Sequence, residues 1–122
     1  MRRIDLPITK EWAWGGATAA GVAVAVVDSG IDASHPEVGS VDRAIALSWD
    51  ADEEAVRYEE GPHDDLYGHG TACAAIIRRA APQARLVSVR VLGQRLSVKG
   101  LVFAAGLRWA IRAGIRVVNL SL

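Results

Sequence analysis

A short apolar run near the start of the chain constrains the fold more than any other feature. Residues 22–27 read Val-Ala-Val-Ala-Val-Val, and they are bounded by Gly21 and by the triplet Asp28-Ser29-Gly30. A continuous run rich in β-branched residues is typical of a strand buried on both faces, which occurs chiefly in parallel sheets. Parallel strands need crossover connections, which are usually helical, so this run predicts an α/β chain.

The rest of the chain alternates in the way that an α/β fold requires. After the first strand we expect a weaker strand at residues 43–49 and a polar acidic loop at 50–65. A helix at 72–80, a strand at 85–92, a helix at 98–113 and a last strand at 116–122 follow. Pro82 stops the first helix, and Gly114 is a typical cap for the second. This order predicts right-handed crossovers and a doubly wound parallel sheet.

Composition and length exclude several classes of protein. The 122 residues suffice for one domain or part of one. No apolar run approaches the ~20 residues that cross a bilayer, and no signal-like stretch precedes Pro7 and Lys10. The single cysteine, Cys73, cannot form an internal disulfide and fits a reducing compartment. We therefore expect a cytoplasmic protein without a membrane partner.

The charges are unevenly distributed although the net charge is zero. All fourteen Asp and Glu residues lie in residues 1–65, whereas nine of the fourteen Lys and Arg residues lie in 66–122. A nucleic-acid site would need clustered basic side chains, commonly with aromatic residues among them. The later arginines are scattered instead. We expect the two halves to neutralise each other across the fold, and we expect no nucleic-acid partner.

Asp28 is the first candidate for a functional residue. It ends the most apolar strand, and functional groups of open parallel sheets gather at the carboxyl ends of strands. A carboxylate in that position could hold an imidazole in one tautomer and stabilise its charged form. The triplet Asp-Ser-Gly is also a common turn, so on its own it does not decide between the two interpretations.

His69 is the second candidate. It lies between Gly68 and Gly70 and precedes a predicted helix. Flanking glycines let the backbone bend closely and leave the imidazole edge open to a substrate, as a general base requires. The alternative is a surface or capping histidine in a glycine-rich turn.

Together the two segments resemble the subtilisin family of serine peptidases. Residues 26–32 with residues 35–37 are similar to its aspartate motif, and residues 68–74 to its histidine motif. Further likenesses follow in the family's order at 81–82, 89–93, 109–110 and 117–122. We interpret roughly residues 12–122 as the N-terminal part of a single subtilisin-like peptidase domain, with residues 1–11 as an extension.

The resemblance implies an incomplete three-layer α/β fold and hydrolysis of peptide bonds by an Asp-His-Ser triad. Asp28 would orient the imidazole, and His69 would act as general base and then as acid. The substrates would be peptides or proteins. The resemblance also implies two substrate-binding stretches, at Gly93, Arg95, Leu96, Ser97, Val98, Asn119, Leu120, Ser121 and Leu122.

The family's serine motif, Gly-Thr-Ser-Met-Ala, does not occur in these 122 residues, nor does the oxyanion asparagine that precedes it. Loss of a triad member costs many powers of ten in rate, and loss of an oxyanion donor ~10²–10³. We therefore expect this chain to be inactive alone and to associate with a complementing C-terminal segment or as an oligomer. The alternative is a non-catalytic subtilisin-like module that binds a peptide or a partner chain.

Two alternatives to the triad are a cysteine nucleophile and a metal site. Cys73 lies four residues after His69, so a Cys-His nucleophile pair is conceivable, but a small buried thiol is the favoured interpretation. A zinc site of His35, His63, His69, Cys73 and nearby carboxylates matches no metal-binding spacing. Glu37 alone predicts no calcium site, because the loop that supplies calcium ligands in many relatives is absent. We expect neither a metal nor a cofactor.

Overall fold

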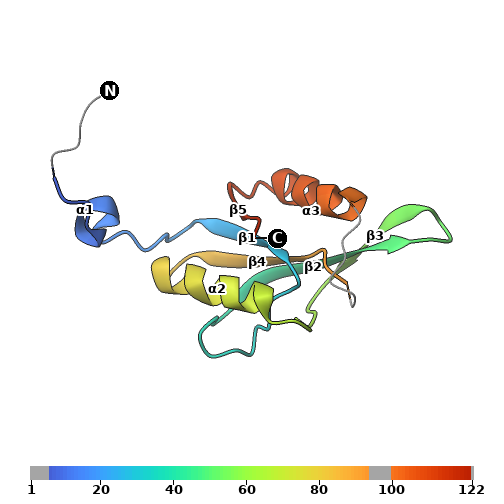
Figure 1. Cartoon of the computed structure of the whole chain (residues 1–122), viewed down its shortest axis with the longest axis horizontal. Helices are drawn as coiled ribbons and strands as arrows, with labels where there is room; N and C mark the ends of the chain where they lie inside the picture. Colours follow the sequence, from blue (N-terminus) through green and yellow to red (C-terminus); the bar gives the residue numbers. More distant parts are fainter. Residues whose placement is uncertain (1–5, 94–99, 122) are drawn as a thin grey trace, which may run out of the picture.

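The computed structural model of the chain describes residues 6–93 and 100–121. Its elements are α1 (Lys10–Trp14), β1 (Ala23–Asp28), β2 (Val41–Asp50), β3 (Ala55–Glu60), α2 (His69–Ala80), β4 (Arg85–Arg90), α3 (Gly100–Arg112) and β5 (Val117–Asn119). The strands form one sheet in the order β3-β2-β4-β1-β5 (Figure 1). The predicted alternation of strands and helices is therefore confirmed in the described part of the chain.

Strand β1 lies inside the sheet, as its apolar sequence predicts. It pairs in parallel with β4 on one side and with β5 on the other, and β4 pairs in parallel with β2. Side chains alternate between the two faces of a strand, so Val24 and Val26 face one layer while Ala25 and Val27 face the other. All four are buried because both faces of the sheet are covered by helices.

The two faces carry separate cores. Helix α3 packs Val102, Ala105 and Ala110 on the face of Ala25 and Val27. Helix α2 packs Ala74 on the face of Val24 and Val26. Figure 1 shows these helices on opposite sides of the sheet. The described residues thus form an incomplete three-layer α/β fold. None of their helices has the length and apolar character needed to cross a membrane.

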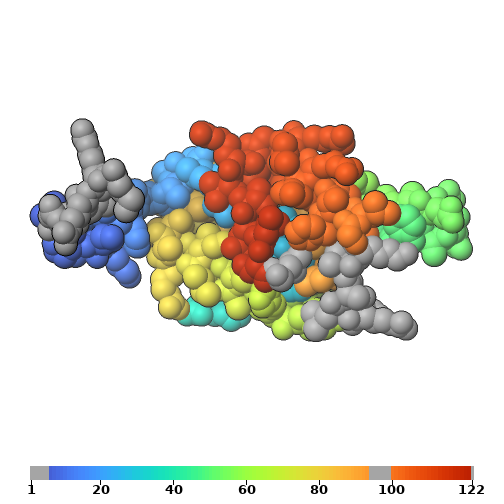
Figure 2. All heavy atoms as spheres, turned by 45° about the horizontal axis from the view of Figure 1, so that its top comes forward, coloured from blue at the N-terminus to red at the C-terminus, as the bar shows by residue number. Residues whose placement is uncertain are grey.

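The prediction of a loop over residues 50–65 is wrong at Asp50, the last residue of β2, and at residues 55–60, which form β3. Strand β2 runs to Asp50, the chain turns, and β3 returns antiparallel to β2, so the sheet is mixed rather than wholly parallel. The acidic composition wrongly indicated a loop, because β3 is an edge strand whose side chains are almost all exposed. Charges are tolerated on such a strand, and they discourage edge-to-edge pairing. The hairpin extends from one end of the molecule (Figure 2).

The bounds of the other elements differ from the predicted ones by a few residues. Helix α2 begins at His69, and β1 includes Asp28, so both candidate residues belong to regular elements. Strand β5 is short, and Leu120 and Ser121 follow it outside the sheet. Helix α1 was not predicted, because it buries no residue and so leaves no apolar periodicity in the sequence.

Replacing Gly106 with Ala is expected to destabilise the fold by about 1–2 kcal/mol. A Cβ atom at Gly106 would lie 2.7 Å from Val91 Cγ1 and 3.3 Å from Val89 Cγ1, so α3 must move away from the sheet. The overpacking outweighs the gain of up to ~1 kcal/mol in helix propensity. Chemical denaturation measures the difference. Gly100→Ala in the same helix, with nothing within 4 Å, is the control and should not lose stability.

Candidate active site

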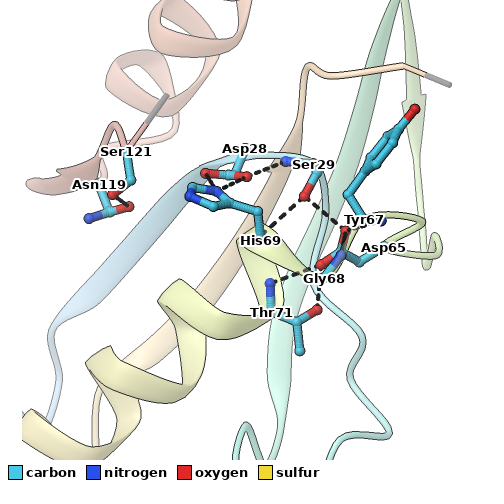
Figure 3. A network of polar contacts seen from close by, with 10 residues as sticks. Asp28, Ser29, Asp65, Tyr67, Gly68, His69, Thr71, Asn119 and Ser121 are labelled. Atoms are coloured by element: carbon cyan, nitrogen blue, oxygen red, sulfur yellow. Dashed lines mark hydrogen bonds and ion pairs between the residues drawn. The ribbon is translucent and has the colours of Figure 1, made fainter. Parts of the chain in front are cut away.

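The two candidate residues contact each other at the carboxyl edge of the sheet. His69 Nδ1 lies 2.8 Å from Asp28 Oδ1 and 2.9 Å from Asp28 Oδ2 (Figure 3). Asp28 is fully buried, whereas 52% of the His69 side chain is exposed. The ring therefore faces a buried carboxylate with Nδ1 and keeps Nε2 as its other reactive nitrogen.

The central position of β1 explains the burial of Asp28. Asp28 is the last residue of β1 and is opposite Arg90 in β4. A buried carboxylate is costly unless it is paired or hydrogen-bonded. Besides the contact with His69, Asp28 Oδ1 accepts a hydrogen bond of 2.7 Å from the Ser29 backbone N–H. These contacts fix the carboxylate in the orientation that the imidazole requires.

His69 lies at the start of α2, and this end of the helix is capped by a residue outside the helix. The N-cap residue, Gly68, has a left-handed φ of 82° and no side chain. Asp65 supplies the missing acceptor: its Oδ2 accepts hydrogen bonds of 2.9 Å from Thr71 N and 2.6 Å from Thr71 Oγ1. Asp65 Oδ1 accepts one of 2.9 Å from Gly68 N. Helix N-termini leave such N–H groups unsatisfied, which explains the need for a distant cap.

Sequence reasoning missed Asp65 because it placed this residue in a solvated loop. The available signal was a carboxylate shortly before a helix whose N-cap position is a glycine. Burial by itself would raise the pKa of Asp65, but the hydrogen bonds donated by Thr71, Ser29 and Gly68 outweigh it and hold the pKa below its usual value. Asp65 is therefore ionised near neutral pH.

Cys73 lies close to the pair. Ligand atoms of Asp28, His69 and Cys73 all fall within 4.8 Å of one another, and in the described residues this is the only such group of His, Cys, Asp and Glu. Cys73 also packs against the core cluster beneath α2 as a partly buried side chain. His35 and His63 do not belong to the group, so the structure brings together only part of the considered zinc site, namely His69, Cys73 and one carboxylate.

His63 occupies a different place, over the sheet. Its Nε2 lies 2.8 Å from the hydroxyl oxygen of Ser88, a fully buried residue of β4. Burial, followed by the positive charge of Arg90, lowers the pKa of His63 below its usual value. The hydrogen bond with Ser88 explains how a polar residue is accommodated inside the sheet.

Lowering the pH is expected to destabilise the chain through His63. Folding lowers the pKa of His63 below its ordinary value of 6.5. The unfolded chain therefore binds a proton at this histidine more readily than the folded chain does. Stability should therefore fall as the pH drops through 6.5, the ordinary pKa of a histidine. In His63→Gln this loss should be smaller, as measured by melting temperature against pH. His35→Gln is the control; if it flattened the profile as much as His63→Gln, His63 would not be the cause.

The predicted substrate-binding residues lie partly within the described chain. Asn119 is opposite Val26 in the pairing of β5 with β1, so the end of β5 lies at the same sheet edge as Asp28 (Figure 3). Ser121 Oγ donates a hydrogen bond of 2.7 Å to Asn119 Oδ1, and Leu120 is 44% exposed. The remaining predicted residues Arg95, Leu96, Ser97, Val98 and Leu122 lie outside the described residues.

Gly93 follows β4 at the same edge. It lines a hollow of about 180 Å³ together with residues of β2, β3, β4 and the segment before α2. Tyr67, Leu92 and Ser29, the residue next to Asp28, are among the residues that line it. The predicted substrate-binding residues that the structure describes thus lie after β4 and after β5, the two strands that flank β1 and its last residue Asp28.

This arrangement places an Asp–His pair at the carboxyl edge of a sheet whose two faces are covered by helices. The model of the subtilase family matches residues 19–122. The chain therefore belongs to the subtilase family of peptidases.

Individual relatives agree with this assignment. Thermitase from Thermoactinomyces vulgaris is 32% identical over 120 residues, which cover 90% of this chain and 40% of thermitase. Subtilisin E from Bacillus subtilis is 34% identical over 116 residues, covering 88% of this chain and 28% of subtilisin E. The chain thus spans well under half the length of these relatives.

Solved structures give the same result. A lanthipeptide protease superposes with a TM-score of 0.64 at 25% identity, over 83% of this chain and 28% of that protein. Fervidolysin from Fervidobacterium pennivorans, described as a keratinolytic enzyme related to subtilisin, superposes with a TM-score of 0.59 at 27% identity. That match covers 93% of this chain and 19% of fervidolysin. These matches confirm the incomplete subtilisin-like fold.

Proposed function

We propose that this chain supplies the acid and base of a subtilisin-type serine endopeptidase. The observation that carries the proposal is the contact between His69 Nδ1 and the fully buried Asp28 carboxylate, at 2.8 and 2.9 Å, on a histidine ring that is half exposed. A surface histidine in a turn would not need a buried carboxylate of its own. Family membership supports the same interpretation.

The proposed chemistry follows from which ring nitrogen is occupied. Asp28 holds the proton on Nδ1, so the neutral ring presents a lone pair at Nε2. His69 then accepts the proton of a serine hydroxyl as that oxygen attacks a peptide carbonyl. It returns the proton to the leaving amine. Asp28 remains ionised and stabilises the imidazolium formed between the two steps.

The nucleophile and the oxyanion donor are proposed to come from outside these 122 residues. The sequence has no Gly-Thr-Ser-Met-Ala segment, and the curated relatives extend well beyond the matched region. A further segment of the same polypeptide or a separate complementing chain could supply both groups. In each case the added serine must reach His69 Nε2.

Peptide or protein substrates are proposed to bind along the same sheet edge. Gly93 and residues 95–98 would pair with the substrate backbone, and residues 119–122 would form one wall of the side-chain pocket. The exposure of Leu120 and the hollow beside Gly93 support this proposal. A complex with a peptidic inhibitor that leaves these residues uncontacted would contradict it.

A fluorophosphonate probe tests the proposed function, because it labels a serine only when a base activates it. We expect labelling of the complete polypeptide that carries these residues, and none after His69→Ala. A matched His35→Ala variant should still be labelled. If the wild-type protein is folded and remains unlabelled, the chain is better described as a non-catalytic module that binds a peptide or a partner chain.

A further inference from the structure

Asp65 connects the two elements that carry the candidate pair. Its carboxylate accepts hydrogen bonds from five donors, of which three lie at the start of α2 and one in the turn before it. The fifth donor is Ser29 Oγ, at 2.8 Å, in the segment that leaves β1. One side chain therefore contacts both the residue after Asp28 and the turn of helix that holds His69 (Figure 3).

Ser29 transmits this connection to Asp28. Its backbone N–H donates to Asp28 Oδ1 at 2.7 Å, and its hydroxyl oxygen accepts the Gly70 N–H at 3.1 Å. Ser29 is 2% exposed, so its hydroxyl has no alternative partner in water. Asp65 thus fixes the hydroxyl that ties the residue after Asp28 to the residue after His69.

A second connection passes through Thr71. Its side-chain hydroxyl donates to Asp65 Oδ2 at 2.6 Å and accepts the Asp32 backbone N–H at 2.9 Å. The chain that follows β1 is therefore joined to α2 at two points, and both depend on the Asp65 carboxylate. Displacing a reacting group by about 1 Å can cost ~10²-fold in rate, so such a connection matters for catalysis.

We propose that Asp65 is the positioning residue of the Asp28–His69 pair, in addition to capping α2. This inference rests on the proposed function only for the catalytic role of the pair. The positioning of the pair rests on the hydrogen bonds described above. An ionised carboxylate is required, because it accepts at both oxygens. An asparagine of the same shape has one acceptor oxygen and would turn its NH₂ group toward bound donors.

The test is proton NMR of the folded chain, reading the far-downfield resonance of the His69 Nδ1 proton in its hydrogen bond to Asp28. In Asp65→Asn we expect this resonance to be lost, at a temperature where circular dichroism shows the fold intact. Asp64→Asn is the matched control, because it removes the same charge from the exposed neighbouring residue. It should retain the resonance. A folded Asp65→Asn that keeps the resonance would overturn the proposal and leave Asp65 as a helix cap alone.

Ser29→Ala keeps the test decisive if Asp65→Asn does not fold. This variant leaves every hydrogen bond between Asp65 and the α2 region in place, and it removes the two hydrogen bonds of the Ser29 hydroxyl, the one donated to Asp65 and the one accepted from Gly70. Loss of the resonance in folded Ser29→Ala supports the proposal, and its retention contradicts it. Because neither readout involves peptide cleavage, a negative result here is distinct from a negative result with the fluorophosphonate probe.

Discussion

Replacing His69 with Ala is expected to abolish the proposed catalysis, lowering kcat of the polypeptide that carries the triad on the order of 10⁶-fold with little change in KM. This magnitude is known for subtilisin, a member of the same family, and is transferred rather than derived. Its cause is the loss of the imidazole that contacts the buried Asp28 carboxylate at 2.8 Å. Steady-state cleavage of a fluorogenic peptide measures the effect.

The smaller effect of Asp28→Asn provides an internal comparison. An asparagine can present its NH₂ group to Nδ1 and so favour the wrong tautomer, which costs about 10⁴-fold in kcat. His35→Ala is the control for the loss of an imidazole near the site, and it should retain most of the activity. If His69→Ala cleaved peptides within tenfold of the wild type, the assignment of His69 as the base would be wrong.

Replacing Gly70 with Ala is expected to have the largest effect on stability, a loss of at least about 3 kcal/mol. A Cβ atom at Gly70 would lie 2.0 Å from the carbonyl oxygen of Gly30 and 3.2 Å from Asp28 Cβ. The obstacle is backbone, so no rotation of a side chain can relieve it. The start of α2 must separate from the end of β1, which also pulls His69 away from Asp28.

Thermal and chemical denaturation measure this loss. Gly93→Ala is a suitable control, because Gly93 lies at the same sheet edge with nothing within 4 Å of an added Cβ. It should melt close to the wild type. A Gly70→Ala variant with an unchanged melting temperature would show that the contact between Gly70 and Gly30 is not essential to the fold.

Much of the fold could be predicted from local patterns. The run at 22–27 predicted the buried parallel strand β1, and helical spacing with Gly114 predicted α3. Strand β3 was not predicted, because an exposed edge strand has neither an apolar face nor a continuous apolar run. Its identity as a strand depends on the ladder with β2, which is a tertiary contact.

A site residue could be predicted where its side chain is a common catalytic group and its neighbours in the sequence form a recognisable pattern. His69 between two glycines and Asp28 after an apolar strand are such residues. Asp65 was not predictable in the same way, because its role comes from donors as far away in the sequence as Ser29. An acidic residue in an acidic segment carries no sign of which donors surround it in the fold.

The sequence by itself determined that the chain forms an α/β sheet and that Asp28 and His69 are candidates for an acid–base pair. Burial of apolar strands and the conformational preferences of glycine and proline are local effects, and they can be recognised without coordinates. Only the tertiary structure decided that the two residues, 41 positions apart, meet at 2.8 Å. It also decided that Asp65 accepts hydrogen bonds from both elements, because hydrogen bonds between distant segments exist only after the sheet and helix have packed.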